Sequence, residues 1–251
     1  MNRLSPIHWV YLLAHLVLVI GGVALQPLQG FWATFGQGVL AAGVAGYVVF
    51  AYVLMHDELA DRVRVVSEFG ILKIFASRGA QIRNEYEELL GDFNELDVLG
   101  FGLNSLREDY KDSFVDWAKR ARVRILLLDP DFPTPETSLA AIRDAEEGKA
   151  SDAIAAEVKR FVEDAAPAVA RPDGRFAIRL YRCIPSINLF RVDDRLFWGP
   201  YLIRQPSRNL PTFLVAKPGT LYEKCRDHFN DIWDSDDLSG PVPAEWLEDR
   251  T

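Results

Sequence analysis

The chain has 251 residues, and its 28 lysines and arginines and 36 aspartates and glutamates give a formal net charge of −8. The charge is unevenly distributed, because no charged residue lies between Leu4 and His56 and Arg3 is the only charge before Asp57. Residues 57–251 therefore carry −9, since the total of −8 includes the +1 of Arg3. This pattern excludes a fully soluble globule, a disordered chain and a basic nucleic-acid-binding protein.

Two apolar stretches, 6–25 and 31–55, fill the uncharged segment. Each is long enough to cross a hydrocarbon core of roughly 30 Å as a helix, which takes about 20 residues. The residues between them contain Pro and Gly and predict a turn, so residues 1–56 are predicted to form a transmembrane helical hairpin. A cleaved signal peptide is the alternative. The first stretch is long for one, no clear small-residue cleavage site follows it, and a second span comes at once.

The flanking charges predict how the hairpin is oriented. Arg3 precedes the first span, Arg62, Arg64 and Lys73 follow the second, and the turn has no Lys or Arg. The positive-inside rule then places both termini and the main domain in the cytoplasm. We expect a multi-pass protein of the inner membrane, with the lipid bilayer as a partner.

Polar and small residues within the spans suggest contacts between helices. His15 falls near the middle of the first span, where an ionisable group is a functional hypothesis. The alternative is a neutral His15 that forms a hydrogen bond to a neighbouring helix. The second span carries the small-residue pairs Ala41/Ala45 and Ala42/Gly46, which permit close packing within the hairpin or between protomers.

The charged remainder divides into a helical stalk over 57–69, one α/β domain over 70–234 and an acidic tail over 235–251. The hydrophobic periodicity and the turn residues predict the domain's elements. The short apolar run Ile71–Ala76 fits either a strand or a turn that leads into the domain. Predicted strands are Leu96–Leu103, Val123–Leu128, Phe176–Cys183, Ile187–Val192, Leu196–Ile203 and Thr212–Ala216; predicted helices are Ala80–Asn94, Ser105–Ala121, Thr137–Glu147, Ser151–Ala166 and Thr220–Trp233.

The order of these elements predicts the fold class. Strands alternate with helices at first, then four strands follow one another before a closing helix. This order is typical of a mixed sheet with helices on its faces, rather than a purely parallel doubly wound sheet. The fold class is therefore α/β, with an N-terminal transmembrane hairpin and a cytosolic mixed-sheet domain.

Few residues point to a familiar chemistry. The sequence has no Walker loop, GxGxxG, HExxH or GxSxG motif, and too few histidines outside the hairpin for a His-rich metal site. Cys183 and Cys225 are expected to be reduced core residues. The pairs Asp129/Asp131 and Asp193/Asp194 fit turns better than metal ligands. We therefore predict no metal and no cofactor.

An arginine-containing segment is the clearest candidate for binding an anion. Arg204, Ser207 and Arg208 follow a predicted strand, and two guanidinium groups with backbone N–H groups can hold a phosphate or a nucleotide. The alternative is a solvated hairpin loop.

Four stretches of the chain resemble a known protein family. The stretches 96–102, 123–130, 188–201 and 229–233 look like phospholipase D-like domains, many bacterial versions of which are degenerate regulatory modules. The resemblance covers roughly residues 70–235 and rests on motif order. It implies the fold, a phosphate-sized pocket and, because single-motif members resemble halves that pair, a homodimer.

The catalytic motif of that family is altered here. The family pattern His-x-Lys-x4-Asp followed by Gly reads Ser186-x-Asn188-x4-Asp193, with Gly199 after it. The resemblance assigns the nucleophile to the His and phosphate binding to the Lys, and Ser186 and Asn188 supply neither an imidazole nor a cation. We therefore expect no hydrolase activity, so no catalytic residue is predicted, while Ser186, Asn188 and Asp193 remain candidates for a ligand pocket.

The sequence thus predicts a membrane-anchored, non-catalytic phospholipase D-like sensor or effector. It would bind a phosphate-containing ligand, such as a nucleotide, or a protein partner in the cytoplasm and signal to its hairpin. The layout resembles membrane effectors of bacterial signalling or antiphage systems, which is an analogy of fold alone. The acidity argues against direct binding of nucleic acid. One alternative is a membrane-bound phosphodiesterase or nuclease with a non-standard active site, and another is a docking protein without a small ligand.

Overall fold

The computed structural model describes residues 6–76, 80–206 and 209–247. The chain divides into two compact units, Met1–Val65 and Val66–Thr251. Each unit is described by itself.

The first unit is a helical hairpin. Helix α1 spans Pro6–Leu25 and helix α2 spans Phe31–Phe69, a single helix of 39 residues whose last residues belong to the second unit. The segments His8–Leu25 and Phe31–Leu54 are long and apolar enough to cross a membrane, with mean hydropathies of 1.9 and 1.7. Most of their side chains are exposed in the hairpin, unlike those of a core helix in a soluble protein. Such an apolar surface is compatible with the hydrocarbon core of a membrane.

Glycines let the two helices of the hairpin pack closely. A Cβ atom on Gly22 would lie 2.5 Å from the backbone nitrogen of Leu40, and one on Gly43 would lie 3.0 Å from that of Val19. The His15 ring occupies the space beside Gly46, where an added Cβ would lie 1.7 Å from the ring. Of the predicted small-residue contacts, Gly46 therefore serves packing within the hairpin.

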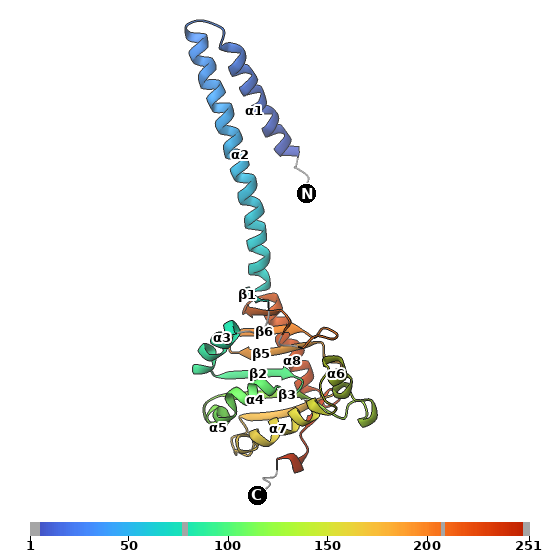
Figure 1. Cartoon of the computed structure of the whole chain (residues 1–251). Helices are drawn as coiled ribbons and strands as arrows, with labels where there is room; N and C mark the ends of the chain where they lie inside the picture. The colour runs from blue at the N-terminus through green and yellow to red at the C-terminus, as the bar shows by residue number, and fades with distance from the viewer. Residues whose placement is uncertain (1–5, 77–79, 207–208, 248–251) are drawn as a thin grey trace. The chain divides into compact units, whose positions relative to one another are not determined.

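The second unit is built on one mixed sheet of eight strands in the order β1-β7-β6-β5-β2-β3-β4-β8 (Figure 1). Only β2–β3 and β3–β4 pair in parallel; the other neighbours are antiparallel. The predicted mixed α/β architecture is confirmed. The strands are β1 (Ile71–Phe75), β2 (Glu95–Gly100), β3 (Arg122–Leu128), β4 (Phe176–Tyr181), β5 (Ile187–Val192), β6 (Arg195–Pro200), β7 (Thr212–Ala216) and β8 (Ser239–Pro241).

Helices cover both faces of this sheet. On one face Phe114 packs on Phe161 and Phe176, which joins α5, α7 and β4, while Tyr86 of α3 packs on β5 and β6. On the other face α8 contacts β4 to β8. The helices are α3 (Ala80–Gly91), α4 (Asn104–Tyr110), α5 (Phe114–Arg120), α6 (Leu139–Glu147), α7 (Ala153–Val169) and α8 (Thr220–Asp234).

The sheet extends beyond the predicted end of the domain at residue 234. Strand β8 pairs antiparallel with β4, and the Ser239 hydroxyl donates a hydrogen bond to the Ile232 carbonyl oxygen at 2.7 Å. Arg179 donates to the Ser239 carbonyl oxygen at 2.7 Å. These contacts fix the start of the predicted tail as a sheet edge, which shields the outer side of β4.

The reactivity of the Cys225 thiol reports whether α8 is packed on the sheet. Burial raises the pKa of the Cys225 thiol on α8 to about 11. The thiolate is the reactive form, so at pH 8 we expect iodoacetamide to modify Cys225 on the order of 100-fold more slowly than an ordinary thiol. Peptide mapping by mass spectrometry of the native and the denatured chain measures this. Equal rates in the two states would contradict a packed α8.

Candidate functional site

The predicted motif lies along β5, which runs antiparallel to the parallel strands β2, β3 and β4. The carboxyl ends of those three strands form one edge of the sheet, and β5 begins at that edge. We call this the carboxyl edge, and define it by Phe101, Tyr181, Asn188 and Tyr201. Ligand groups commonly gather at such an edge in α/β proteins.

Ser186 and Asn188 lie at the carboxyl edge but differ in burial. Ser186 is exposed, and its carbonyl oxygen accepts a hydrogen bond from the Tyr201 backbone at 3.0 Å. Asn188 is only 3% exposed, and its Nδ2 donates to the Gly199 carbonyl oxygen across the β5–β6 pair at 3.0 Å. A Cβ atom on Gly199 would lie 2.8 Å from the Pro211 carbonyl oxygen. The Asn188 side chain therefore joins β5 to β6, where Gly199 lies close to the Pro211 backbone.

Asp193 lies at the opposite edge. It follows the last residue of β5 in a turn, with a φ of 47°, and its carboxylate accepts hydrogen bonds from the backbone nitrogens of Asn94 at 3.1 Å and Glu95 at 2.9 Å. At a rise of about 3.3 Å per residue, the strand separates it from Asn188 by roughly 16 Å. The structure therefore does not bring the three predicted motif residues into one pocket.

The environment of Asp193 predicts a structural effect when it is replaced. Asp193→Ala removes the acceptor of two backbone N–H groups where β2 begins, so we expect the free energy of unfolding to fall by about 1–3 kcal/mol. Asp193→Asn retains an acceptor oxygen and is expected to lose less. Urea denaturation of the full chain in detergent measures both. An unchanged unfolding midpoint in Asp193→Ala would contradict this role.

The loop after β6 is held by a buried arginine that the sequence did not single out. Arg143 on α6 donates to the carbonyl oxygens of Leu202 at 2.9 Å and Gln205 at 2.6 Å, and to Glu147 at 2.7 Å. Its guanidinium also lies over the Tyr201 ring, 5.7 Å from the centroid. The only signal for Arg143 in the sequence is its spacing of four residues from Glu147, which is typical of an ion pair on a helix.

The structure describes only part of the arginine-containing segment in this loop. Arg204 is exposed and has a φ of 60°. Ser207 and Arg208 lie outside the described residues. Arg204 thus lies in the loop between Leu202 and Gln205, whose carbonyl oxygens Arg143 binds.

A tyrosine at the carboxyl edge is buried with an unused hydroxyl. Tyr181 ends β4 and is almost fully buried, and its hydroxyl has no hydrogen-bond partner in the part of the chain that the structure describes. Burial raises its pKa well above the usual value, and the nearby Tyr201 and Cys183 add to this effect. The hydroxyl therefore stays protonated and remains an available donor.

The aspartate pair after β3 forms a turn. The Asp129 carboxylate accepts from the Asp131 backbone nitrogen at 3.0 Å and from Arg182 Nε at 2.8 Å. The turn interpretation is confirmed. Across the described ranges, no group of three His, Cys, Asp or Glu side chains is arranged to hold a metal ion.

The α8 face of the sheet contains a buried charged cluster, which we call the Asp97 cluster. The Asp97 side chain is only 1% exposed. Its carboxylate accepts two hydrogen bonds from Arg124 at 2.8 Å and one from Arg191 Nε at 2.7 Å. Arg124 also donates to Asn230 of α8 at 2.9 Å, and Arg191 donates to Glu95 at 3.0 Å. The cluster joins β2, β3, β5 and α8.

The pKa shifts follow from these contacts. Burial alone would lower the pKa of Arg191, but the charge and hydrogen bonds of Asp97 hold it above the usual value. Burial alone would raise the pKa of Glu95, but hydrogen bonds from Arg122 and Arg191 hold it below the usual value. Both shifts favour the charged forms of Arg191 and Glu95, as the pairing of buried charges requires.

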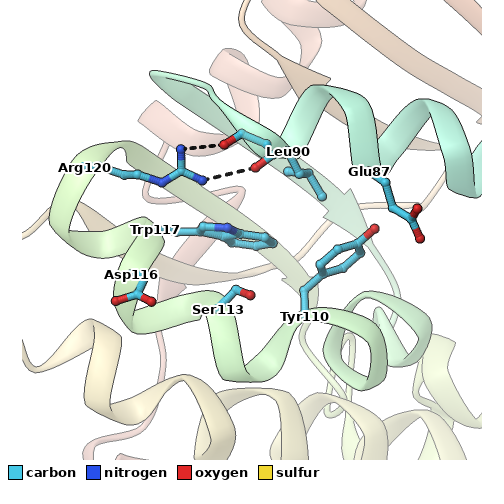
Figure 2. Close-up of a pocket in the computed structure, with 8 residues that line it drawn as sticks. Glu87, Leu90, Tyr110, Ser113, Asp116, Trp117 and Arg120 are labelled. Carbon is cyan, nitrogen blue, oxygen red and sulfur yellow. Dashed lines mark hydrogen bonds between the residues drawn. The ribbon is translucent and has the colours of Figure 1, made fainter.

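A shallow pocket of about 410 Å³ lies between α3 and α5, away from the predicted motif (Figure 2). Arg120 is its cation, and it already donates to the carbonyl oxygens of Leu90 at 3.1 Å and Gly91 at 3.2 Å. Two of the five N–H donors of this guanidinium are therefore already used by the end of α3. Its lining residues are Glu87, Leu90, Gly91, Tyr110, Ser113, Asp116, Trp117 and Arg120.

In the hairpin, His15 bonds within its own helix. Its Nδ1 lies 2.8 Å from the Tyr11 carbonyl oxygen, and its ring lies 5.9 Å from the rings of Tyr11 and Tyr47. The Tyr47 hydroxyl donates to the Leu12 carbonyl oxygen at 3.0 Å and so joins α2 to α1. The predicted bond between helices is made by Tyr47 rather than by His15.

Comparison with known proteins gives only distant similarities. No protein-family model and no curated protein matches the sequence. Among solved structures, the chain is similar to the archaeal chromatin protein TrmBL2, which binds DNA, at 13% identity and a TM-score of 0.39, over 78% of this chain and 68% of that one. It is also similar to phosphatidylserine synthase of Haemophilus influenzae Rd KW20, at 13% identity and a TM-score of 0.45 over 70% of this chain. The chain spans 40% of the length of the synthase.

Proposed function

We propose that the chain is a membrane-anchored, non-catalytic phospholipase D-like sensor or effector. Its cytoplasmic domain binds a phosphate-containing ligand or a protein partner at the carboxyl edge, and it signals to the hairpin. We further propose a role in bacterial signalling or antiphage defence, and the only support for this role is the order of two membrane helices followed by a cytoplasmic domain.

The arrangement of the altered motif carries the proposal. Ser186 and Asn188 stand where the family pattern has its nucleophile and its phosphate-binding cation. Asn188 is buried and donates to Gly199, and Asp193 accepts from the backbone where β2 begins. Phosphoryl transfer needs a nucleophile with a proton acceptor and a cation to stabilise the developing charge. Two of the three motif residues are thus engaged in holding the fold.

Exposed aliphatic side chains at the carboxyl edge favour a protein partner as the occupant. Ile184 is 80% exposed and Ile203 is 74% exposed, and the hydrogen bond from Tyr201 to Ser186 joins the segments that carry them. Large apolar side chains that stay exposed close together are typical of interaction surfaces. A partner that covers them would reach the exposed Arg204 as well.

The hairpin supports anchoring in the membrane. Its two helices have the length and composition of membrane spans, and the turn between them has no Lys or Arg. By the positive-inside rule the turn faces outward, and both termini and the main domain face the cytoplasm of the inner membrane.

Thiol labelling in intact bacterial cells tests this anchoring. We expect an impermeant maleimide to label a Gln29→Cys variant of the full chain at the turn, and to label the parent chain only after the cells are opened. Both proteins should remain in the membrane pellet after alkaline carbonate extraction. Extraction into the supernatant would contradict anchoring, and labelling of the parent chain in intact cells would contradict the orientation.

A further inference from the structure

A polar side chain lies on an exposed face of helix α2. Gln37 lies within the apolar segment Phe31–Leu54 and is exposed in the hairpin. No described residue forms a hydrogen bond with its amide, and Gln37 makes no bond across to α1. A primary amide has two donors and an acceptor, and leaving them unpaired in hydrocarbon is costly. Gln37 therefore requires a partner that the hairpin does not supply.

The surface around Gln37 has the spacing of a helix–helix seam. Gln37, Ala41, Val44 and Val48 are separated by four, three and four residues, and all four are exposed. This is the alternation that keeps one stripe of a helix facing another helix. At 3.6 residues per turn the stripe lies about a third of a turn from the face that packs on α1. We call these four residues the Gln37 seam.

We propose that the Gln37 seam binds the same seam of a second copy of this chain, with the two Gln37 amides bonded to each other. This inference rests on the proposed membrane span. Two primary amides related by a two-fold axis can each donate to the other, so the group is its own complement. The short Ala41 side chain lets the helices approach closely next to the amides.

The other exposed face of α2 lacks this complementarity. Gly38, Ala42 and Val49 lie along it, and an apolar groove passes beside Gly38. No amide or charge on that face distinguishes a second copy from a lipid chain. The position of Gln37 therefore selects one of two possible seams.

Cysteine cross-linking of the full chain in membranes tests the inference. Disulfides form where Cα atoms lie about 4.4–6.8 Å apart. We expect Ala41→Cys chains to cross-link as dimers under copper phenanthroline, and Val49→Cys chains to remain monomers. Adding Gln37→Leu to Ala41→Cys should weaken dimer formation roughly five- to thirty-fold, and Gln37→Asn should restore part of it. The parent chain, with only Cys183 and Cys225, measures background cross-linking.

The outcomes separate this inference from the proposed anchoring. Cross-linking at Ala41→Cys that is unaffected by Gln37→Leu, or that occurs instead at Val49→Cys, would overturn the seam while leaving the anchor intact. Absence of cross-linking at both positions would also overturn it. Failure of the chains to remain in the membrane pellet after carbonate extraction would overturn the anchor and the seam together.

Discussion

Replacing Asp97 with alanine is expected to lower the free energy of unfolding by about 3–5 kcal/mol, the usual cost of breaking a buried ion pair by removing one partner. The substitution leaves the Arg124 and Arg191 guanidinium groups without the carboxylate that both of them bond. Arg124 retains Asn230 and Arg191 retains Glu95, but neither has an acceptor in place of Asp97. Urea denaturation of the full chain in detergent micelles, followed by tryptophan fluorescence, measures the loss.

The matched control for this variant is Asp194→Ala. Asp194 is exposed and lies 3.6 Å from Lys217, so its removal should change the free energy of unfolding by less than about 1 kcal/mol. Equal small effects of the two variants would show that the Asp97 cluster does not hold α8 on the sheet.

Replacing Gly70 with alanine is expected to lower the free energy of unfolding by about 2–5 kcal/mol, from a left-handed backbone and an overpacked contact. Gly70 has a φ of +72°, and an added Cβ would lie 2.5 Å from the Ala216 carbonyl oxygen and 2.6 Å from the Gly219 Cα. Both of these are backbone atoms, so no side chain can move aside. The same urea denaturation measures the effect.

Gly174→Ala separates the two causes. Gly174 also has a left-handed φ, +59°, but an added Cβ would meet nothing within 4 Å. It should lose only about 1–2 kcal/mol, the cost of the backbone conformation. If Gly70→Ala loses no more than Gly174→Ala, the close approach of Gly70 to Gly219 is not a constraint on the fold.

The sequence predicted the sheet where strands are buried on both faces. Residues Val123–Leu128 form a continuous aliphatic run, and they lie within β3 between two parallel neighbours. Strand β8 was not predicted, because Ser239–Pro241 is three residues long, contains Gly and Pro, and has no hydrophobic alternation. Only the pairing partner on β4 makes it a strand.

The site was less predictable, because its contacts depend on the register between strands. The sequence placed Asn188 and Gly199 in one motif, but their hydrogen bond requires the β5–β6 pairing that sets them opposite each other. Asp97, Arg124 and Arg191 likewise meet only because three strands from distant parts of the chain lie side by side. The only signal in the sequence was that Asp97, Arg124 and Arg191 are charged residues within otherwise apolar strands.

Phosphodiester turnover by the full chain in lipid nanodiscs tests whether the cytoplasmic domain is catalytic. The substrates are bis(p-nitrophenyl) phosphate, a phospholipid and single-stranded DNA, and the matched variant is Ser186→Ala, whose exposed side chain can be removed without disturbing the core. A non-catalytic domain predicts no product above the protein-free rate for either protein. Turnover by the parent chain that Ser186→Ala abolishes, with its unfolding midpoint unchanged, would show that the domain is an enzyme.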